Sequence, residues 1–215
     1  SNEIDAYRKA YPDVNILELL EEHRHQVGLI RKWLMQQTRE PFFLVDDDIR
    51  IGLKSNLNIE QCFDVLERHI NSGVSMTGFG QQLFCNSQID NTIIINGDAW
   101  AIRDKFVSTV YAINPLHFDD CPLEDLPIYE DIALIIHGIQ HSGTIVSYVA
   151  THTNVSPPGG GDNLWRTREA TIDCLHKLVA LYPEICSIKE TKNKTHSQDL
   201  GIGLRVAWAK IKRLS

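Results

Sequence analysis

Phe42-Phe43-Leu44-Val45, followed at once by Asp46-Asp47-Asp48, is the stretch that decides the fold class of this 215-residue chain. Four apolar residues in a row are typical of a buried strand. The three carboxylates then end the strand abruptly in a loop of negative charge. In open α/β sheets, ligands bind at the carboxyl ends of the strands. This stretch therefore predicts both a strand and the edge of the sheet at which a site is expected.

Helical and strand patterns alternate along the rest of the chain. Apolar spacing predicts helices over residues 23–37, 59–70, 131–140 and 169–181, and short apolar runs predict strands over 92–95, 144–149 and 204–208. Asn58 is suited to cap the second helix, Gly73 to end it, and Pro183 to end the last one. No repeat or linker divides the chain. We therefore expect a single α/β domain over residues 1–215, with a mixed, mostly parallel sheet flanked by helices.

The charge of the chain argues against one class of function. Lys and Arg number 21 against 28 Asp and Glu, which gives a formal net charge of −7. A protein that coats a nucleic-acid backbone depends instead on many cationic side chains. Residues 189–215 nevertheless carry seven basic and two acidic side chains. This part of the chain is either a local basic surface or a solvated edge that keeps the protein in solution.

Cysteine spacing and hydropathy exclude further classes. The five cysteines are far apart and form no CxxC pair, so neither a disulfide framework nor a thiolate zinc site is encoded. No apolar run approaches the roughly 20 residues of a membrane-spanning helix, and residues 1–12 lack the apolar core of a signal peptide. We expect a cytoplasmic protein with no membrane partner.

The three adjacent carboxylates repel one another, and a bound cation is one way to offset that repulsion. Mn²⁺ and Mg²⁺ prefer oxygen ligands. His152, which follows the strand over 144–149, adds an imidazole that also suits Mn²⁺. A metal ion held there would neutralise the phosphates of a bound nucleotide. The alternative is an acidic turn with solvated side chains, together with a histidine that is only structural.

Two further groups of polar residues are candidates for the chemistry. Glu130 and Asp131 open a predicted helix, where they either stabilise its dipole or act as general base toward a hydroxyl. Arg24 and Arg31 lie seven residues apart, nearly on one helix face, and either bind phosphates or remain solvated. The Pro-Pro-Gly-Gly-Gly run over 157–161 predicts a mobile loop that would close over a substrate.

Short motifs follow one another in a definite order over most of the chain. They are Glu22-His23-Arg24, Gly28 to Trp33, Phe42 to Arg50, Tyr129-Glu130-Asp131, Gly160 to Asn163, Trp165-Arg166-Thr167, Leu181-Tyr182-Pro183, Lys192-Asn193-Lys194 and Arg205 to Trp208. This ordered set resembles the phage TET-associated glycosyltransferases, a GT-A-fold group linked to sugar addition on modified DNA bases.

The resemblance implies a GT-A-like domain that uses Mn²⁺ or Mg²⁺ and a nucleotide-sugar, such as a UDP-sugar, as donor. It implies the metal ligands Asp46, Asp48 and His152, the donor-binding residues Arg24, Arg31, Asp46, Asp47, Gly160, Gly161 and Arg166, and the acceptor-side acids Glu130 and Asp131. Asp131 is the expected catalytic base if the enzyme inverts configuration. GT-A enzymes usually begin with a strand that holds the nucleotide base. This chain opens without such a strand, so we expect either that the strand is missing from its beginning or that its donor pocket differs from that of other GT-A enzymes.

The leading hypothesis is a metal-dependent glycosyltransferase that moves a sugar from the nucleotide-sugar to a hydroxymethyl-pyrimidine in phage DNA, or to a sugar already on it. Trp165 or Trp208 would stack on a base, and a base within a duplex would first be flipped out. Two alternatives use the same acidic cleft. One is a non-catalytic nucleotide-binding α/β module, and the other is a nucleotidyltransferase or pyrophosphohydrolase.

Overall fold

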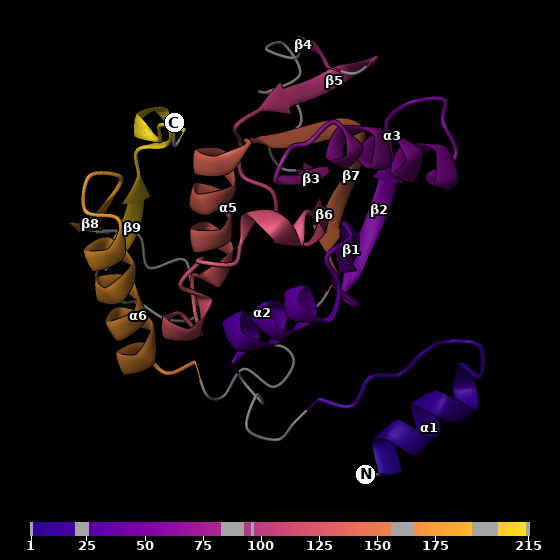
Figure 1. Cartoon of the computed structure of the whole chain (residues 1–215), viewed down its shortest axis with the longest axis horizontal. Helices are drawn as coiled ribbons and strands as arrows, with labels where there is room; N and C mark the ends of the chain where they lie inside the picture. Colours follow the sequence, from indigo (N-terminus) through magenta and orange to yellow (C-terminus); the bar gives the residue numbers. More distant parts are fainter. Residues whose placement is uncertain are drawn as a thin grey trace.

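The computed structural model describes residues 2–19, 26–82, 93–95, 97–155, 166–190 and 202–213. The α-helices within these residues are α1 (Asn2–Ala10), α2 (Val27–Gln37), α3 (Ile59–Asn71), α5 (Glu130–His141) and α6 (Arg168–Leu181). The strands are β1 (Phe42–Val45), β2 (Ile49–Leu53), β3 (Met76–Gln81), β4 (Ile93–Ile95), β5 (Asp98–Arg103), β6 (Val110–Ile113), β7 (Thr144–Asn154), β8 (Cys186–Glu190) and β9 (Ile202–Val206). Short 3₁₀ turns are η4 (Pro115–His117), η5 (Leu123–Asp125) and η6 (Trp208–Lys210). In Figure 1, α1 lies apart from the other elements.

Seven strands form one curled, mixed sheet in the order β1-β6-β3-β7-β5-β4, with β2 paired to the last residues of β7. β3 and β7 are parallel, and the other described pairings in this sheet are antiparallel. The mixed α/β sheet confirms the expected class, whereas the expectation of a mostly parallel sheet is wrong. Parallel neighbours need a long crossover, here the one that contains α5, while β4 and β5 are joined by a tight turn at Gly97.

Helices cover both faces of the sheet. In β6, Tyr111 and Ile113 belong to the same apolar cluster as α5, while Val110 packs in a second cluster with Leu66 of α3. Successive side chains of a strand point to opposite faces, so α5 and α3 lie on opposite sides. The α5 cluster also contains residues of α2 and α6, which places these helices on the α5 side (Figure 1).

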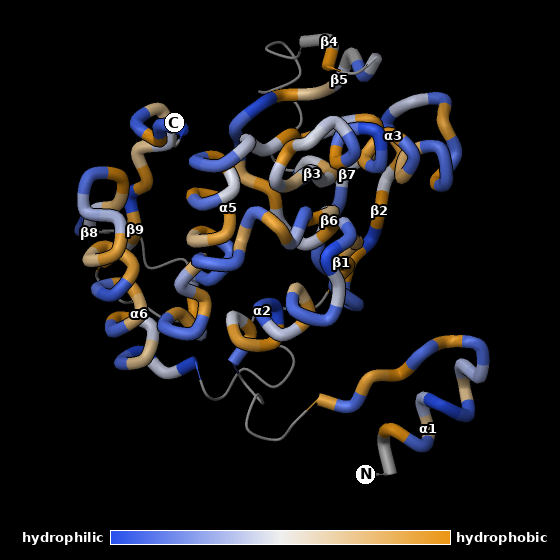
Figure 2. The backbone as a smooth tube through the Cα atoms, viewed as in Figure 1, coloured by the Kyte–Doolittle hydropathy of each residue, from blue (hydrophilic) through white to orange (hydrophobic). Residues whose placement is uncertain are grey.

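The helix α5 is buried over most of its length, and this burial fixes where its acidic first turn lies. Residues 133–139 are all buried, and Figure 2 shows hydrophobic residues along the helix. A helix that is apolar all round is held by neighbours on several sides, here the sheet, α2 and α6. No described helix combines the length and apolar character needed to cross a bilayer.

The predicted cap of α3 is confirmed. Oδ1 of Asn58 accepts from the backbone N–H of Gln61 at 2.9 Å, and Oε1 of Gln61 accepts from the N–H of Asn58 at 2.9 Å. This reciprocal pair satisfies two N–H groups that the first turn leaves free, and such a cap contributes about 1 kcal/mol. Gly73 follows the helix with φ of +91°, which glycine adopts without a steric penalty.

Three predicted strands differ from the observed ones. β1 is half-exposed rather than buried. Among the described strands it pairs only with β6, and its Phe43 and Val45 are 39% and 50% exposed. β7 continues beyond Val149, since its last residues pair with β2, so His152 lies within a strand instead of after one. β9 ends at Val206 and pairs with β8 in a separate two-stranded sheet, which leaves Trp208 in a 3₁₀ turn.

Candidate active site

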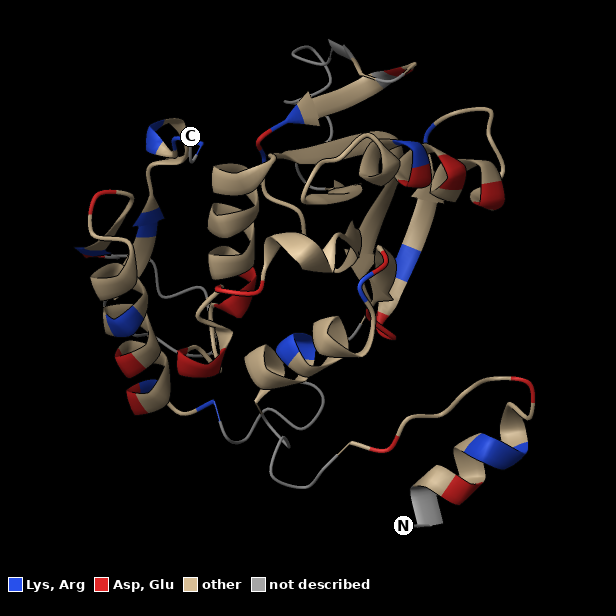
Figure 3. Cartoon of the chain, viewed as in Figure 1, with Lys and Arg blue, Asp and Glu red and all other residues tan. Residues whose placement is uncertain are grey.

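A polar cavity of about 260 Å³ lies between α2, the first turn of α5 and the turn that follows β1. Residues predicted for the site line it from four separate segments: Arg31, Asp46, Glu130, Asp131 and Arg166. The other lining residues are Met76, Val107, Ser108, Thr109, Tyr111, Leu134 and Asn154. Figure 3 shows acidic residues (red) at the start of α5 and after β1, and basic residues (blue) in α2 facing this region.

Two non-glycine residues beside this cavity have left-handed backbone. Tyr129 precedes α5 with φ of +68°, and Thr109 lines the cavity with φ of +71°. Such a conformation costs on the order of 1 kcal/mol or more, and it is least favourable for a β-branched residue. The carbonyl of Thr109 accepts from the N–H of Asp46 at 3.0 Å, and Tyr129 sets the start of α5. Both strained residues therefore hold acids in place, as is common at functional sites.

Arg31 is largely enclosed in the cavity. Its Nη1 lies 2.9 Å from Oε1 of Glu130, and the two side chains are only 15% and 8% exposed. Its guanidinium carbon lies 5.8 Å from the centre of the Tyr111 ring. Burial lowers the pKa of Arg31, but Tyr111 and the nearby carboxylates raise it, and the net pKa is above its ordinary value. Arg31 is therefore a permanent positive charge in the cavity.

The carboxylates of the cavity hold protons more tightly than free acids do. Burial raises the pKa of Glu130 and of Asp131, and Arg31 offsets this only in part. Burial also raises the pKa of Asp46; Arg31 lowers it, and Asp48 raises it further. Negative charge thus exceeds what the surroundings stabilise, and a divalent cation would relieve it. A carboxyl group with a raised pKa is also better suited to act as a general base.

Of the predicted metal ligands, His152 is held away from Asp46, whereas Asp48 lies close enough to Asp46 to raise its pKa. Asp46 lines the cavity, while Asp48 lies in the turn between β1 and β2, where its carbonyl accepts from the N–H of Val155 at 2.8 Å. His152 pairs with Ile51 of β2, is 1% exposed and lines a different pocket. The strand pairing holds His152 inside the sheet. Among the described residues, the group of acids and histidines with ligand atoms within 4.8 Å of one another contains none of these three.

Three other residues predicted for the site, Arg24, Gly160 and Gly161, lie outside the residues that the structure describes. Asp47 lies in the turn after β1, beside Asp46 and Asp48, but does not line the cavity.

Some lining residues carry no motif in the sequence. Tyr111 lies in an apolar strand, and Asn154 reaches the cavity at the end of β7. Nothing in the sequence marks Asn154, because its position depends on the pairing of β7 with β2.

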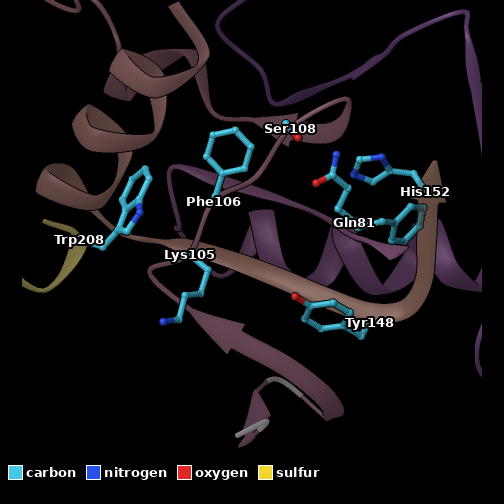
Figure 4. A pocket seen from close by; sticks show the side chains of 8 residues that line it. Gln81, Lys105, Phe106, Ser108, Tyr148, His152 and Trp208 are labelled. Carbon is cyan, nitrogen blue, oxygen red and sulfur yellow. The ribbon is translucent and has the colours of Figure 1, made fainter. Parts of the chain in front are cut away.

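A second pocket, of about 460 Å³, adjoins the first through Ser108, which lines both. Its lining residues are Phe79, Gln81, Lys105, Phe106, Ser108, Tyr148, His152 and Trp208. In Figure 4 the Gln81 and His152 side chains lie next to each other, across the pocket from Phe106 and Trp208. The rings of Phe106 and Trp208 meet edge to face with centres 6.1 Å apart. We name this the aromatic pocket, and the first cavity the charged cleft.

His152 forms part of the wall of the aromatic pocket and is almost fully buried. Within the described residues, its buried Nδ1 has no hydrogen-bond partner. Burial lowers the pKa of His152, and a hydrogen bond to the backbone of Phe79 offsets this only in part. The imidazole is therefore neutral at pH 7, with one nitrogen left for a polar atom of a ligand.

The two cavities together offer complementary chemistry. The charged cleft offers arginines for phosphate oxygens and carboxylates for a hard cation or a proton. The aromatic pocket offers ring faces and a few polar groups, which suit a planar heterocycle. Comparison with family models, with curated proteins and with solved structures gives no match.

Proposed function

We propose that this chain is a metal-dependent glycosyltransferase that moves a sugar from a nucleotide-sugar, such as a UDP-sugar, to a hydroxymethyl-pyrimidine of DNA or to a sugar already on it. The observation that carries the proposal is the convergence of Arg31, Asp46, Glu130, Asp131 and Arg166 in the charged cleft. These residues come from four segments far apart in sequence. The family resemblance implies a role at the donor or acceptor for each of them.

The donor diphosphate would lie in the charged cleft. Arg31 and Arg166 can each donate to phosphate oxygens in a charge-assisted way. Asp46, together with Asp48 of the adjacent turn, would hold Mn²⁺ or Mg²⁺, which supplies charge neutralisation for the departing diphosphate. Few protein ligands are needed, because such ions are often bound by one or two carboxylates plus substrate phosphates. The raised pKa of Asp46 supports this role, since a cation would stabilise its ionised form.

Asp131 is the proposed general base. It would accept the proton of the acceptor hydroxyl as that oxygen forms its bond to the anomeric carbon. The bond from that carbon to the diphosphate oxygen breaks at the same time, and its electron pair leaves with the diphosphate. Glu130 is committed to its ion pair with Arg31, so its role is to orient that arginine.

The acceptor base would occupy the aromatic pocket. Ring faces of Phe106 and Trp208 suit a planar pyrimidine, and stacking of this kind contributes about 1–3 kcal/mol per base. Lys105 lines the same pocket and is exposed, in a position to meet a DNA phosphate. Because the aromatic pocket adjoins the charged cleft at Ser108, an acceptor hydroxyl would lie near the donor. A base in a duplex would have to be flipped out to enter.

The proposal is tested by transfer to DNA that contains hydroxymethyl-pyrimidines. The protein is incubated with Mn²⁺ and a panel of nucleotide-sugars, and the nucleosides of the digested DNA are weighed by mass spectrometry. We expect a mass increment of one sugar with one donor. Removal of a general base typically costs a factor of about 10² to 10⁴, so Asp131→Asn should lose the increment.

The matched control is Asp64→Asn, an exposed acid on α3 at the opposite face of the sheet. It should transfer at the rate of the unchanged protein. Release of pyrophosphate without transfer would instead identify a nucleotidyltransferase or pyrophosphohydrolase. Binding of nucleotide without turnover would identify a non-catalytic module. Equal transfer by Asp131→Asn would refute the proposed base.

A further inference from the structure

A cluster of histidines lies at the end of α5 that is remote from the charged cleft. His137 and His141 are four residues apart on this helix, so their side chains lie on the same face. Asp120, in the loop after η4, faces them. One ligand atom from each of these three side chains lies within 4.8 Å of the other two.

The spacing of these atoms is close to what a metal ion requires. Oδ1 of Asp120 lies 3.0 Å from Nε2 of His137 and 3.9 Å from Nε2 of His141. Two ligands of a tetrahedral zinc ion, each about 2.0–2.1 Å from the metal, are roughly 3.3 Å apart. The two observed distances lie on either side of this value, so small side-chain rotations are enough to reach it.

The imidazoles are oriented by their surroundings. The ring of His137 is hydrogen-bonded to the backbone of His117 as well as to Asp120, and Phe118 packs against it with ring centres 5.7 Å apart. The ring of His117 stacks on His141 with centres 6.2 Å apart and an angle of 11°. Metal-binding histidines are commonly held by such a bond from the second ring nitrogen to a backbone carbonyl.

One nitrogen of the cluster makes no hydrogen bond to any described residue, although Asp120 lies 3.9 Å from it. Nε2 of His141 is buried and makes no hydrogen bond within the described residues. A buried polar atom without a partner costs free energy, and a metal ion would satisfy it. The Asp120 side chain is 75% exposed, so an ion can reach the cluster from solvent and keep bound water. The C-terminal end of a helix also favours a positive charge.

We propose that Asp120, His137 and His141 bind one divalent transition-metal ion, with Zn²⁺ as the best match. Two imidazoles and one carboxylate suit zinc and its neighbours, whereas Mg²⁺ and Mn²⁺ prefer sites made of oxygen. The ion ties the loop that contains Asp120 to the end of α5. Asp131 and His141 are ten residues apart on α5, or about 15 Å along its axis, so this site is separate from the charged cleft and does not depend on the proposed function.

The test is calorimetric titration of ZnCl₂ into protein that has been stripped with a chelator. We expect one Zn²⁺ per chain and a rise in Tm when zinc is bound. His141→Gln and Asp120→Asn should weaken binding at least about tenfold to a hundredfold, the loss seen when even the outer partners of metal ligands are removed. Both positions are partly exposed, so the variants should fold.

Two measurements exclude binding elsewhere. His176→Gln removes an exposed histidine of α6 and should bind zinc like the unchanged protein. Co²⁺ in place of Zn²⁺ should give visible absorption bands without the strong thiolate band that cysteine ligands produce, and His141→Gln should lose these bands. Failure to bind one equivalent of zinc, or equal binding by His141→Gln, would overturn the proposal.

Discussion

Replacing Arg31 by Met should destabilise the fold strongly, and replacing Glu130 as well should recover much of the loss. The Met side chain keeps most of the packing of Arg31 but removes its charge. Glu130, which is 8% exposed and paired to Arg31 at 2.9 Å, is then a buried carboxylate without its partner. Breaking a buried ion pair in this way costs about 3–5 kcal/mol.

We expect the lower end of this range for Arg31→Met, about 3 kcal/mol at pH 8, because the cleft is open to water and Glu130 can take up a proton. For a chain of this size each kcal/mol shifts Tm by about 2–4 °C, so the expected fall is about 6–12 °C. The fall should shrink toward pH 5. Burial raises the pKa of Glu130 already, and loss of Arg31 raises it further, so protonation relieves the unpaired charge as pH falls.

The assay is thermal and urea unfolding of the unchanged protein, Arg31→Met, Glu130→Gln and the double variant. The double variant should be more stable than Arg31→Met, with a coupling energy on the order of 2 kcal/mol. Arg39→Met is the matched control, because Arg39 pairs with Asp119 at an exposed surface site, and its Tm should hardly change. Equal losses for Arg31→Met and Arg39→Met, or no recovery in the double variant, would refute this reasoning.

Three other substitutions test the fold and the site. Asp98→Asn should cost about 1–3 kcal/mol at pH 7, since the buried carboxylate of Asp98 accepts from Oγ of Ser147 at 2.6 Å and from the N–H of Trp100 at 2.8 Å, and lies 3.2 Å from Nε2 of His69. Burial raises the pKa of Asp98, but its hydrogen bonds lower it more, so this contribution is present above about pH 4 and is lost as pH falls further; urea unfolding at pH 3 and 7 checks it. In Gly28→Ala the new Cβ would overlap the backbone carbonyl of Leu123. Ala stabilises a helix by about 1 kcal/mol relative to Gly. We expect this gain to be smaller than the destabilisation of about 2–3 kcal/mol caused by overpacking, so Tm should fall. Asp131→Asn should raise Tm by a few degrees at pH 8, because burial raises the pKa of Asp131 and its ionised form opposes folding. The gain should vanish below about pH 3, where the acid is protonated in the unfolded chain as well as in the folded one.

Local patterns were enough to predict α2, α3, α5 and α6, though not α1, and part of the charged cleft. The capping box depends on Asn58 and Gln61, which are three residues apart in the sequence, and the structure contains it. The acidic start of α5 follows from two residues at the head of an apolar stripe. Signals of this kind depend on neighbours in sequence, so they can be recognised without tertiary structure.

Features that depend on pairing between distant segments could not be predicted. His152 and Asp46 were expected to meet, but the pairing of β2 with β7 holds His152 in the aromatic pocket. The sequence shows directly that His137 and His141 are four residues apart. Nothing in the sequence shows that Asp120 lies opposite them. The orientation of β6 between β1 and β3 likewise depends on long-range contacts.

The central claim is that the charged cleft binds the diphosphate of a nucleotide together with a divalent cation. Calorimetric titration of UDP, with and without Mn²⁺, tests this most directly in the unchanged protein and in Asp46→Asn. Our account predicts binding that requires Mn²⁺ and is weakened at least tenfold, or about 1.4 kcal/mol, by Asp46→Asn. Equal binding by the two proteins, or no binding to the unchanged protein with Mn²⁺ present, would contradict it.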